Sequence, residues 1–305
     1  MGASSWPRRH FPMRFGYLLA LLAALACSTF AQAEGVLDRV RGGGPLVIAH
    51  RESSVPFSYV HEGRAVGYAV DLCLRIAEVV RQKTGRKDMP VQMLQVTPSN
   101  RIEAVKSGKA DMECGSTTNN AERRKDVAFT IPHFITGARL LVPAASKVER
   151  MEDLEGRKLV STQGTTPLKA AEQANRERLM RIQMVEAPDH EAAVRMVEKG
   201  EADAFVMDDV LLYGLASNRA DPQALKVVGR FVTTEPLAIM LPKGDDEFKK
   251  LVDAEMRRLI SSREIYAIYD RWFMRPIPPT QRALNLPVSY LLRDFWKYPS
   301  DEVPF

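Results

Sequence analysis

Cysteine is scarce in this sequence, with three residues among 305, so the chain is not one of the small scaffolds that disulfides hold together. Aromatic residues make up only 8%, and no run of Lys and Arg with interleaved aromatic residues occurs, which argues against a nucleic-acid-binding surface. Neither a G-x-S-x-G nucleophile motif nor an H-E-x-x-H metal motif is present. The proportions, 45% hydrophobic and 27% charged, are those of a globular protein, and the length suggests about two domains.

An apolar run lies near the start of the chain, over residues 15–26, and is too short to span a bilayer. A small-x-small sequence follows at residues 31–33, and three basic residues precede the run: Arg8, Arg9 and Arg14. This order is typical of a secretory signal, so we expect residues 1–33 to be removed and the mature chain to lie outside the cytoplasm. Without the three arginines, 40 basic residues face 38 acidic ones, and the net charge of +5 falls to +2.

Cys27 offers an alternative form of N-terminal processing. The residues Leu25-Ala26-Cys27 faintly resemble a lipoprotein cleavage box, which would place a lipid anchor on Cys27. A larger aliphatic residue is usual where Ala24 stands. We therefore favour cleavage after residue 33, with no anchor.

Two cysteines, Cys73 and Cys114, remain in the mature chain, in a compartment where disulfides persist. Cys73 lies on the apolar stripe of an expected helix, and Cys114 ends an expected strand. Two interpretations are open: a disulfide between a helix and its own sheet, or two buried thiols that act as small hydrophobic residues. Two cysteines are too few for a metal site, and we expect none.

Short apolar segments alternate with amphipathic helical patterns along the chain. This alternation indicates βαβ units, and hence an α/β fold with mainly parallel sheets flanked by helices. The expected strands are residues 46–49, 91–96, 110–114, 139–142, 158–162, 182–186, 204–207 and 237–241. Two amphipathic helices are expected at residues 248–260 and 263–273, and their aromatic residues are expected to pack in the core.

A V-x-x-G-x-A-D pattern occurs twice, at residues 105–111 and 197–203. In each copy an expected helix ends on the glycine and leads into a strand, which suggests two similar α/β lobes. We expect a discontinuous first lobe, of residues 34–138 and 239–305, and a second lobe of residues 139–238 whose end strands form the hinge.

Polar residues follow the expected strands at the point where each strand ends. In open α/β sheets, ligands bind beyond the carboxyl ends of the strands, so we expect these residues to face a cleft between the lobes. The charged groups of that cleft are Arg51, Arg101, Arg123, His190 and Asp208. Hydroxyl groups add neutral donors: Ser116, Thr117, Thr118, Thr165 and Thr166. An amino acid with two carboxylates and one ammonium matches this set.

Each of these residues also has an ordinary structural role. A single arginine after a strand commonly forms a solvated ion pair, and Ser or Thr at a helix start caps the helix. Asp189 is expected to cap the helix that begins near His190, and one of Asp208 and Asp209 to cap the next helix. Three arginines that converge on one cleft are harder to explain in this way.

Several longer segments carry a specific resemblance. Together they cover essentially the whole mature chain and are similar to the periplasmic glutamate/aspartate-binding proteins of ABC importers: HRESSVPFSY (50–59), GYAVDLC (67–73), NRI (100–102), ECGSTTNNAERRKDVAFT (113–130), GTT (164–166), DH (189–190), MDD (207–209) and RPIPP (275–279). The resemblance implies a type II periplasmic-binding-protein fold, in which two lobes joined by two crossover strands close on a free amino acid.

The resemblance also implies roles for the cleft residues. Asp208 would receive the α-ammonium of the ligand. The α-carboxylate would be bound by Arg123 with Ser116, Thr117 and Thr118. The side-chain carboxylate would be bound by Arg51, Arg101, His190 and one of Thr165 and Thr166. Phe57 either packs against the ligand's methylene groups or lies in the core.

By the same resemblance, the chain is expected to be a periplasmic solute-binding protein and not an enzyme. It would need no cofactor, act as a monomer, and deliver L-glutamate or L-aspartate to an ABC transporter permease in the inner membrane. Two alternatives stay open: a periplasmic enzyme on the same scaffold, such as a dehydratase, or a ligand-sensing partner of a membrane receptor.

Overall fold

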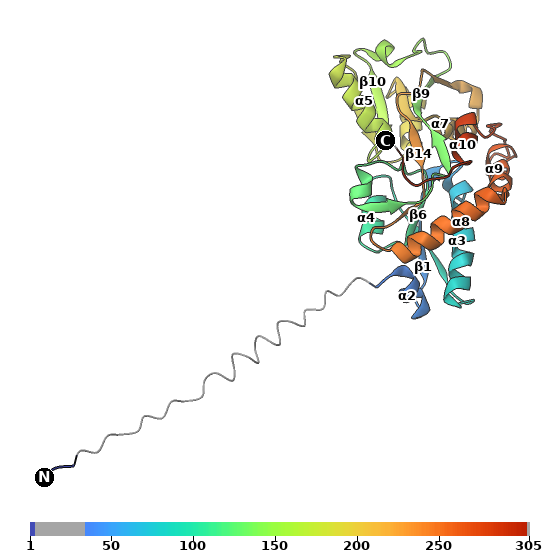
Figure 1. Cartoon of the computed structure of the whole chain (residues 1–305). Coiled ribbons are helices and arrows are strands. Elements are labelled where there is room, and N and C mark those ends of the chain that lie inside the picture. Colours follow the sequence, from blue (N-terminus) through green and yellow to red (C-terminus); the bar gives the residue numbers. More distant parts are fainter. Residues whose placement is uncertain (4–33, 304–305) are drawn as a thin grey trace. The chain divides into compact units, whose positions relative to one another are not determined.

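Two five-stranded sheets, one in each of two lobes, form the framework of the protein (Figure 1). The computed structural model describes residues 1–3 and 34–303, so the rest of the predicted signal segment, with Cys27, lies outside the described residues. Gly35–Phe305 form one compact unit. The expected α/β fold with two lobes is confirmed.

The first sheet combines parallel strands with one strand that returns from the other lobe. In spatial order its strands are β5 (Val91–Gln95), β1 (Leu46–His50), β6 (Met112–Cys114), β15 (Met240–Pro242) and β7 (Val127–Phe129). β1 pairs in parallel with β5 and β6, so that Ile48 stands opposite both Met93 and Met112. β15 is antiparallel to β6 and β7.

The second sheet follows the same plan. Its strands are β11 (Gln183–Ala187), β10 (Lys158–Thr162), β12 (Ala204–Asp208), β9 (Ala138–Pro143) and β13 (Leu225–Val228). β10 pairs in parallel with β11 and β12, whereas β9 is antiparallel to β12 and β13. In both sheets the fourth position is taken by the strand through which the chain passes between the lobes.

Two crossover strands join the lobes, as expected. β8 (Phe134–Thr136) and β14 (Glu235–Leu237) pair antiparallel, with Thr136 opposite Glu235. The strand predicted over residues 237–241 is split, because β14 ends at Leu237 and β15 begins at Met240. The chain thus changes from the crossover pair to the first sheet within a few residues.

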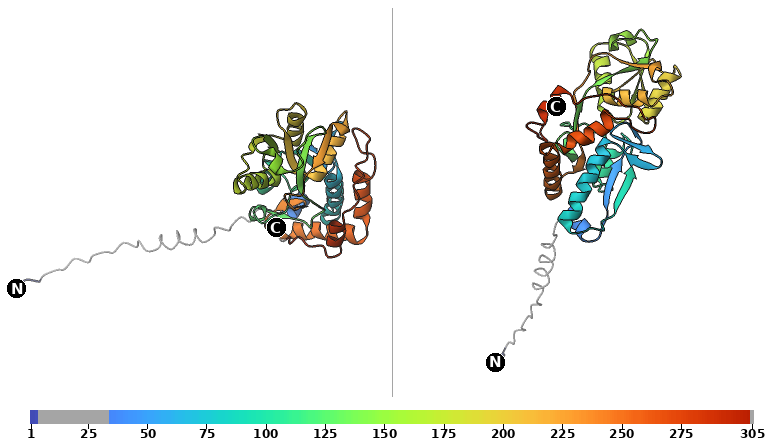
Figure 2. Two further views of the ribbon diagram at one scale, coloured as in Figure 1. Left: turned by 90° about the horizontal axis from the view of Figure 1, so that it is seen from above. Right: turned by 90° about the vertical axis from the view of Figure 1, so that its right-hand side faces the viewer.

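Helices cover the sheets of both lobes. In the first lobe, α8 (Asp246–Ser261) and α9 (Glu264–Phe273) contact α3 (Tyr68–Thr84) and each other (Figure 2). The remaining helices are α2 (Val36–Arg41), α4 (Arg101–Lys106), α5 (Thr166–Glu177), α6 (His190–Glu198), α7 (Asp209–Ser217) and α10 (Tyr290–Phe295), with 3-10 turns η1 (Arg123–Lys125), η2 (Met151–Leu154) and η3 (Pro222–Ala224). None of the helices in residues 1–3 and 34–303 is long and apolar enough to cross a membrane.

Short elements were not predicted from the sequence. A small antiparallel sheet of β2 (Ser53–Ser54), β3 (Ser58–His61) and β4 (Arg64–Val66) follows β1. Strands of two to four residues are too short to show a clear alternation of apolar and polar positions.

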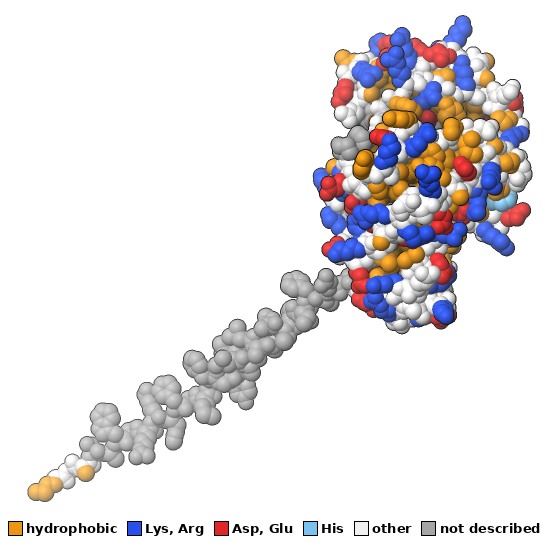
Figure 3. All heavy atoms as spheres, turned by 45° about the vertical axis from the view of Figure 1, so that its right-hand side comes forward, with side chains coloured by type: hydrophobic (Ala, Val, Ile, Leu, Met, Phe, Trp, Pro, Cys, Tyr) orange, Lys and Arg blue, Asp and Glu red, His pale blue; other side chains and the backbone are white. Residues whose placement is uncertain are grey.

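Basic and acidic side chains are interspersed on the face drawn in Figure 3, with apolar side chains near its middle.

The repeated V-x-x-G-x-A-D sequence folds in the same way in both lobes. Its glycines adopt φ of +73° and +70°, a conformation that favours glycine. In the first lobe, the Asp111 carboxylate accepts the Val47 N–H at 2.7 Å, and the Asp111 N–H donates to the Val47 carbonyl at 2.9 Å. Asp203 makes the same two bonds with Lys158, both at 2.9 Å. The motif therefore fixes the start of the first parallel strand in each lobe.

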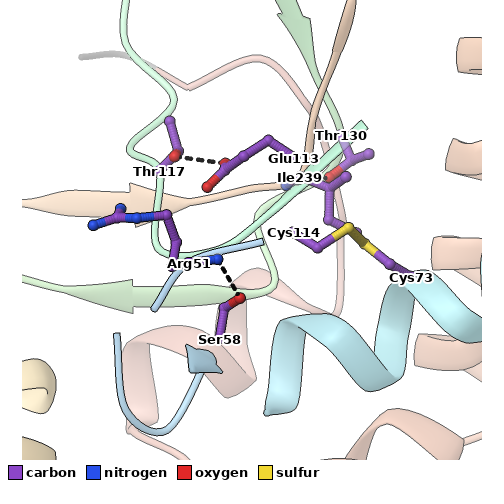
Figure 4. The surroundings of a disulfide bond; sticks show 8 residues. All are labelled: Arg51, Ser58, Cys73, Glu113, Cys114, Thr117, Thr130 and Ile239. Carbon is purple, nitrogen blue, oxygen red and sulfur yellow. Dashed lines mark hydrogen bonds between the residues drawn. A yellow bond between two sulfur atoms is a disulfide. The ribbon is translucent and has the colours of Figure 1, made fainter. Parts of the chain in front are cut away.

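A disulfide joins Cys73 of α3 to Cys114 at the end of β6, with the two Cα atoms 6.3 Å apart (Figure 4). Both residues are buried. The bond ties the helix to its own sheet at the residue from which the loop through Ser116 and Thr118 continues. It thus anchors one wall of the region between the lobes.

We expect reduction of this disulfide to lower the free energy of unfolding by about 4 kcal/mol, because residues 41 positions apart are no longer linked in the unfolded chain. Urea unfolding of the mature protein with and without a reductant measures the change. The Cys73→Ala/Cys114→Ala double variant is the control, since the reductant has no bond to break there. An unchanged unfolding midpoint of the wild-type protein in reductant would contradict the expectation.

An aromatic cluster fills the first lobe next to the crossover. Phe57 contacts Tyr68, Phe134 and Phe273 at ring-centroid distances of 6.2, 5.0 and 5.6 Å. The His133 ring lies among them, 5.9 Å from the ring of Phe57. Burial lowers the pKa of His133 to about 3, so the imidazole is neutral in the folded protein.

We expect His133 to make the protein acid-sensitive. In the unfolded chain an imidazole has a pKa of about 6.5, so below that pH the unfolded state binds a proton that folded His133 rejects. Stability contributed by this residue is present above pH 6.5 and is lost as the pH falls toward 3. In His133→Phe the free energy of unfolding should decline less between pH 6.5 and 4.5, by about 1.4 kcal/mol per pH unit. Phe57→Leu, which disturbs the same cluster without removing a titrating group, should keep the wild-type slope.

Candidate functional site

The polar residues that were expected beyond the strand ends do meet between the lobes. Seven of them line a small cavity of about 10 Å³, measured as the space open to the centre of a water-sized sphere: Arg101, Ser116, Thr118, Thr165, Thr166, His190 and Asp208. Its first-lobe wall consists of Arg101, Ser116 and Thr118, and its second-lobe wall of Thr165, Thr166, Pro167, His190, Met207, Asp208 and Leu211. The carboxyl ends of β6, β10 and β12 therefore face one site, as the rule for open α/β sheets predicts.

Three guanidinium groups are buried at this site. Arg51, Arg101 and Arg123 are 1%, 2% and 8% exposed. Burial, and next the repulsion from Arg101, lower the pKa of both Arg51 and Arg123 to about 9. Burial also lowers the pKa of Arg101 itself. Three buried guanidinium groups that lie close to one another repel, so a negatively charged partner would stabilise them.

Arg123 connects the two lobes directly. It begins the 3-10 turn η1 in the first lobe, and its Nη1 donates to the Thr118 carbonyl at 3.0 Å. Its Nη2 donates to the Gly164 carbonyl of the second lobe at 3.2 Å. Arg123 and Arg51 are not among the residues that line the cavity in the described structure, but both lie close enough to Arg101 for its charge to lower their pKa.

Several buried polar atoms have hydrogen-bonding capacity that the protein itself does not use. Within residues 34–303, no partner is present for Arg51 Nε and Nη1, Arg101 Nε, His190 Nε2 or Asp208 Oδ1. Buried polar groups are ordinarily paired, and exceptions point to a functional site. Three of these groups are donors or potential donors and one is an acceptor, which is the complement of an anion that also carries a cationic group.

The second-lobe residues combine capping with exposure to the cavity. Thr165 caps α5: its hydroxyl accepts the Leu168 N–H at 3.3 Å and donates to the Thr162 carbonyl at 2.7 Å. Asp189 caps α6 by accepting the Ala192 N–H at 2.7 Å. This cap fixes His190 at the first helical position with its ring toward the cavity.

His190 is neutral in this setting. Burial, and then the charges of Arg51 and Arg101, hold its pKa well below the ordinary value. Its Nδ1 lies 2.8 Å from the Thr162 hydroxyl. When that hydroxyl donates to Nδ1, the proton resides on Nε2 and is available as a donor toward the cavity.

The two neighbouring aspartates divide their roles. Asp208 stands at the N-cap position of α7 but makes no side-chain capping bond, and its Oδ1 is one of the unpaired buried atoms. Asp209 instead accepts the Thr136 hydroxyl at 2.6 Å. Burial, and then the nearby Glu235 carboxylate, raise the pKa of Asp208 well above its usual value, and the arginines oppose that shift. Asp208 is therefore the aspartate that faces the cavity.

Two residues of the predicted set point elsewhere. The Thr117 hydroxyl donates to Glu113 Oε2 at 2.6 Å (Figure 4), and Thr117 is not among the residues that line the cavity. Ser116, Thr117 and Thr118 follow one another in an extended segment, so their side chains alternate in direction. Phe57 lies in the aromatic cluster of the first lobe and, in the described structure, is not among the cavity-lining residues.

The sequence did not single out two buried acids beside the site. The Glu113 carboxylate lies close enough to Arg51 for its charge to act on that guanidinium, and Glu235 lies on the crossover strand β14. The Glu235 Oε2 atom accepts hydroxyl protons from both Thr118, at 2.5 Å, and Thr166, at 2.7 Å. The only sign of Glu235 in the sequence is that this one carboxylate directly precedes the apolar sequence Pro-Leu-Ala-Ile-Met-Leu. In the described part of the chain, no group of His, Cys, Asp and Glu side chains is arranged to hold a metal ion.

Comparison with known proteins identifies close relatives of the chain. The family profile of bacterial extracellular solute-binding proteins, family 3, matches residues 46–275. A glutamate/aspartate import solute-binding protein of Salmonella typhimurium is 38% identical over 271 residues, which cover 88% of this chain and 90% of that protein. An L-glutamate/L-aspartate-binding protein of Pseudomonas aeruginosa is 37% identical over 287 residues, 93% and 95% of the two chains.

Among solved structures, the fold resembles that of an ancestral amino acid-binding protein described as a precursor of cyclohexadienyl dehydratase. The two are 27% identical with a TM-score of 0.65, and the match covers 78% of this chain and 99% of the other. By its matched profile and its identity to these relatives, the chain belongs to the bacterial extracellular solute-binding proteins, family 3.

Proposed function

We propose that this protein captures an acidic L-amino acid, glutamate or aspartate, by closing its two lobes, and delivers it to the permease of an ABC importer. The observation that carries this proposal is a set of buried, unpaired atoms: donors on Arg101 and His190 and one acceptor on Asp208 in the lining of the interlobe cavity, and donors on Arg51 close to Arg101. The names of the relatives from Salmonella typhimurium and Pseudomonas aeruginosa support the same ligand class.

The chemistry assigns the ligand's groups as follows. Guanidinium groups suit carboxylates because they donate two parallel hydrogen bonds, so Arg123 with Ser116 binds the α-carboxylate, and Arg51, Arg101 and His190 bind the side-chain carboxylate. Asp208 binds the ammonium. Two carboxylates and one ammonium carry a net charge of −1, which offsets part of the positive charge at the site.

Hinge closure accounts for the distribution of these groups between the lobes. The proposed lobes are residues 34–138 with 239–305, and residues 139–238. A ligand held by Arg101 of one lobe and by His190 and Asp208 of the other favours the closed form, because those contacts exist together only there. The protein would act as a monomer in the periplasm after removal of residues 1–33.

An enzymatic role on this scaffold would need an acid or base free to act at the cavity. Of the candidate groups, Glu191 pairs with Arg219 and Arg195, and Glu52 accepts a bond from Gln95 at the surface. His190 and Asp208 are the remaining acid/base candidates, and both line the cavity near Arg101, where His190 suits a carboxylate and Asp208 an ammonium group.

We expect the mature protein, freed of bound ligand by unfolding and refolding, to bind L-glutamate or L-aspartate with one-to-one stoichiometry and to bind the amides glutamine and asparagine much more weakly. Isothermal titration calorimetry with the four ligands measures this. Arg51, Arg101 and His190, which are proposed to meet the ligand's side chain, offer donors, so a side-chain amide NH₂ there would be a buried donor facing donors. Absence of binding of all four ligands would contradict the proposal and direct attention to the enzymatic alternative.

The arginines should have separable effects. Arg123→Ala should abolish measurable binding of all amino acids, because the α-carboxylate is common to them. Arg101→Ala should weaken glutamate and aspartate by about 100-fold and glutamine much less, since it loses a charge-assisted bond to the side-chain carboxylate. Titrations of both variants measure the split, with Arg195→Ala as the control because that side chain is half exposed and pairs on α6. Equal losses for glutamate and glutamine in Arg101→Ala would refute the division of roles.

A further inference from the structure

The carboxylate of Glu235 lies where the crossover strand β14 meets both lobes. Glu235 is 2% exposed and opens the crossover strand β14. Thr118 belongs to the first-lobe loop after β6, and Thr166 begins α5 in the second lobe. Both hydroxyls converge on the same carboxylate oxygen, at 2.5 and 2.7 Å, and lie 3.1 Å from each other.

The direction of the hydroxyl protons follows from this geometry. A carboxylate oxygen only accepts hydrogen bonds, and each hydroxyl has one proton to donate. Donation by both Thr118 and Thr166 to Glu235 fits the two short distances and leaves no proton for the 3.1 Å contact between the hydroxyls, in which either oxygen could otherwise donate. In this arrangement their lone pairs are left for any other partner. Both threonines line the cavity together with Asp208.

We propose, on the basis of the function proposed above, that Glu235 is a positioning residue that turns the hydroxyls of Thr118 and Thr166 into acceptors for the ligand's ammonium group. With Asp208, the two hydroxyl oxygens form an all-acceptor subsite, which suits a group with three N–H donors and no acceptor. This assignment changes the roles expected for the two hydroxyls, because neither retains a proton for a carboxylate of the ligand.

Glu235 also links ammonium binding to closure. Its two hydrogen bonds reach one threonine from each lobe, so the pair exists only when the lobes are together. The carboxylate belongs to the hinge strand, and the same contact that orients the acceptors therefore stabilises the closed arrangement. Charge interactions support its proximity, since Glu235 acts on Asp208, Arg101 and Arg123.

The test compares two ligands that differ in the ammonium. Glutarate has the two carboxylates of L-glutamate and no ammonium, so it does not use the proposed subsite. Glu235→Gln should weaken L-glutamate by about 10-fold more than glutarate, because the amide NH₂ is a donor and lets one hydroxyl turn. Competition binding against labelled glutamate gives the affinity ratio of the two ligands. If the wild-type protein binds no acidic amino acid, the proposed function fails; if it binds and the ratio is unchanged in Glu235→Gln, the role of Glu235 fails.

Glu113→Gln is the matched control. Glu113 is a fully buried carboxylate that likewise accepts a threonine hydroxyl, but its partner Thr117 is not among the residues that line the cavity. Its charge acts on arginines that would bind carboxylates of both ligands, so the glutamate-to-glutarate ratio should stay within about 2-fold of wild type. A ratio that falls as far in Glu113→Gln as in Glu235→Gln would show a general charge effect and overturn the proposal.

Substitutions of Thr166 separate positioning from structural support and serve if Glu235→Gln does not fold. Thr166→Val removes the hydroxyl and should lower the ratio, whereas Thr166→Ser keeps it and should restore the ratio. In a Thr118→Val/Thr166→Val background, Glu235→Gln should have no further effect on the ratio, because the hydroxyls through which it acts are gone. An additive loss in that background, or an unchanged ratio in Thr166→Val, would overturn the proposal.

Discussion

The burial of three guanidinium groups beside one cavity is the constraint on which the rest of the site depends. Burial removes the hydration of Arg51, Arg101 and Arg123 and brings their like charges close together. Both effects destabilise the charged form and lower the pKa of Arg51 and Arg123. Three buried carboxylates stand close to them: Glu113, Asp208 and Glu235. These carboxylates offset part of the positive charge, and an anionic ligand of the proposed kind would offset more of it.

The shared plan of the two sheets explains how such distant residues meet. In each lobe the V-x-x-G-x-A-D motif fixes the start of the first parallel strand, and the polar loops emerge at the opposite, carboxyl end. The crossover pair of β8 and β14 then holds those two ends toward each other. Because Glu235 and Thr136 lie on this pair and bind Thr166 and Asp209 of the second lobe, the hinge itself forms part of the site's hydrogen-bond network.

Much of this could be predicted from the sequence, because local rules decide it. Lys158–Thr162 is the strand that its apolar pattern predicts, Asp189 caps α6 as its position indicates, and the residues after the strands reach the cavity. Glu235 could not be predicted in this way, since its partners Thr118 and Thr166 lie 117 and 69 residues away in the sequence and no local pattern records them. The direction of Thr117 and the burial of Phe57 likewise depend on packing that only the folded chain defines.

The protons of the cavity's threonines bear on the selectivity for carboxylates that the proposed function requires. Of the three threonine hydroxyls that line the described cavity, Thr118 and Thr166 donate to Glu235, and Thr165 donates to the Thr162 carbonyl. The oxygens of these hydroxyls are then left as acceptors, which suit the ammonium group of the proposed ligand and not its carboxylates. With those protons committed, the charged guanidinium groups are left as the main donors, and they cannot change their role. Where the ligand's side chain faces the guanidinium groups, an amide would therefore present its own NH₂ to donors, whereas a carboxylate would accept from all of them.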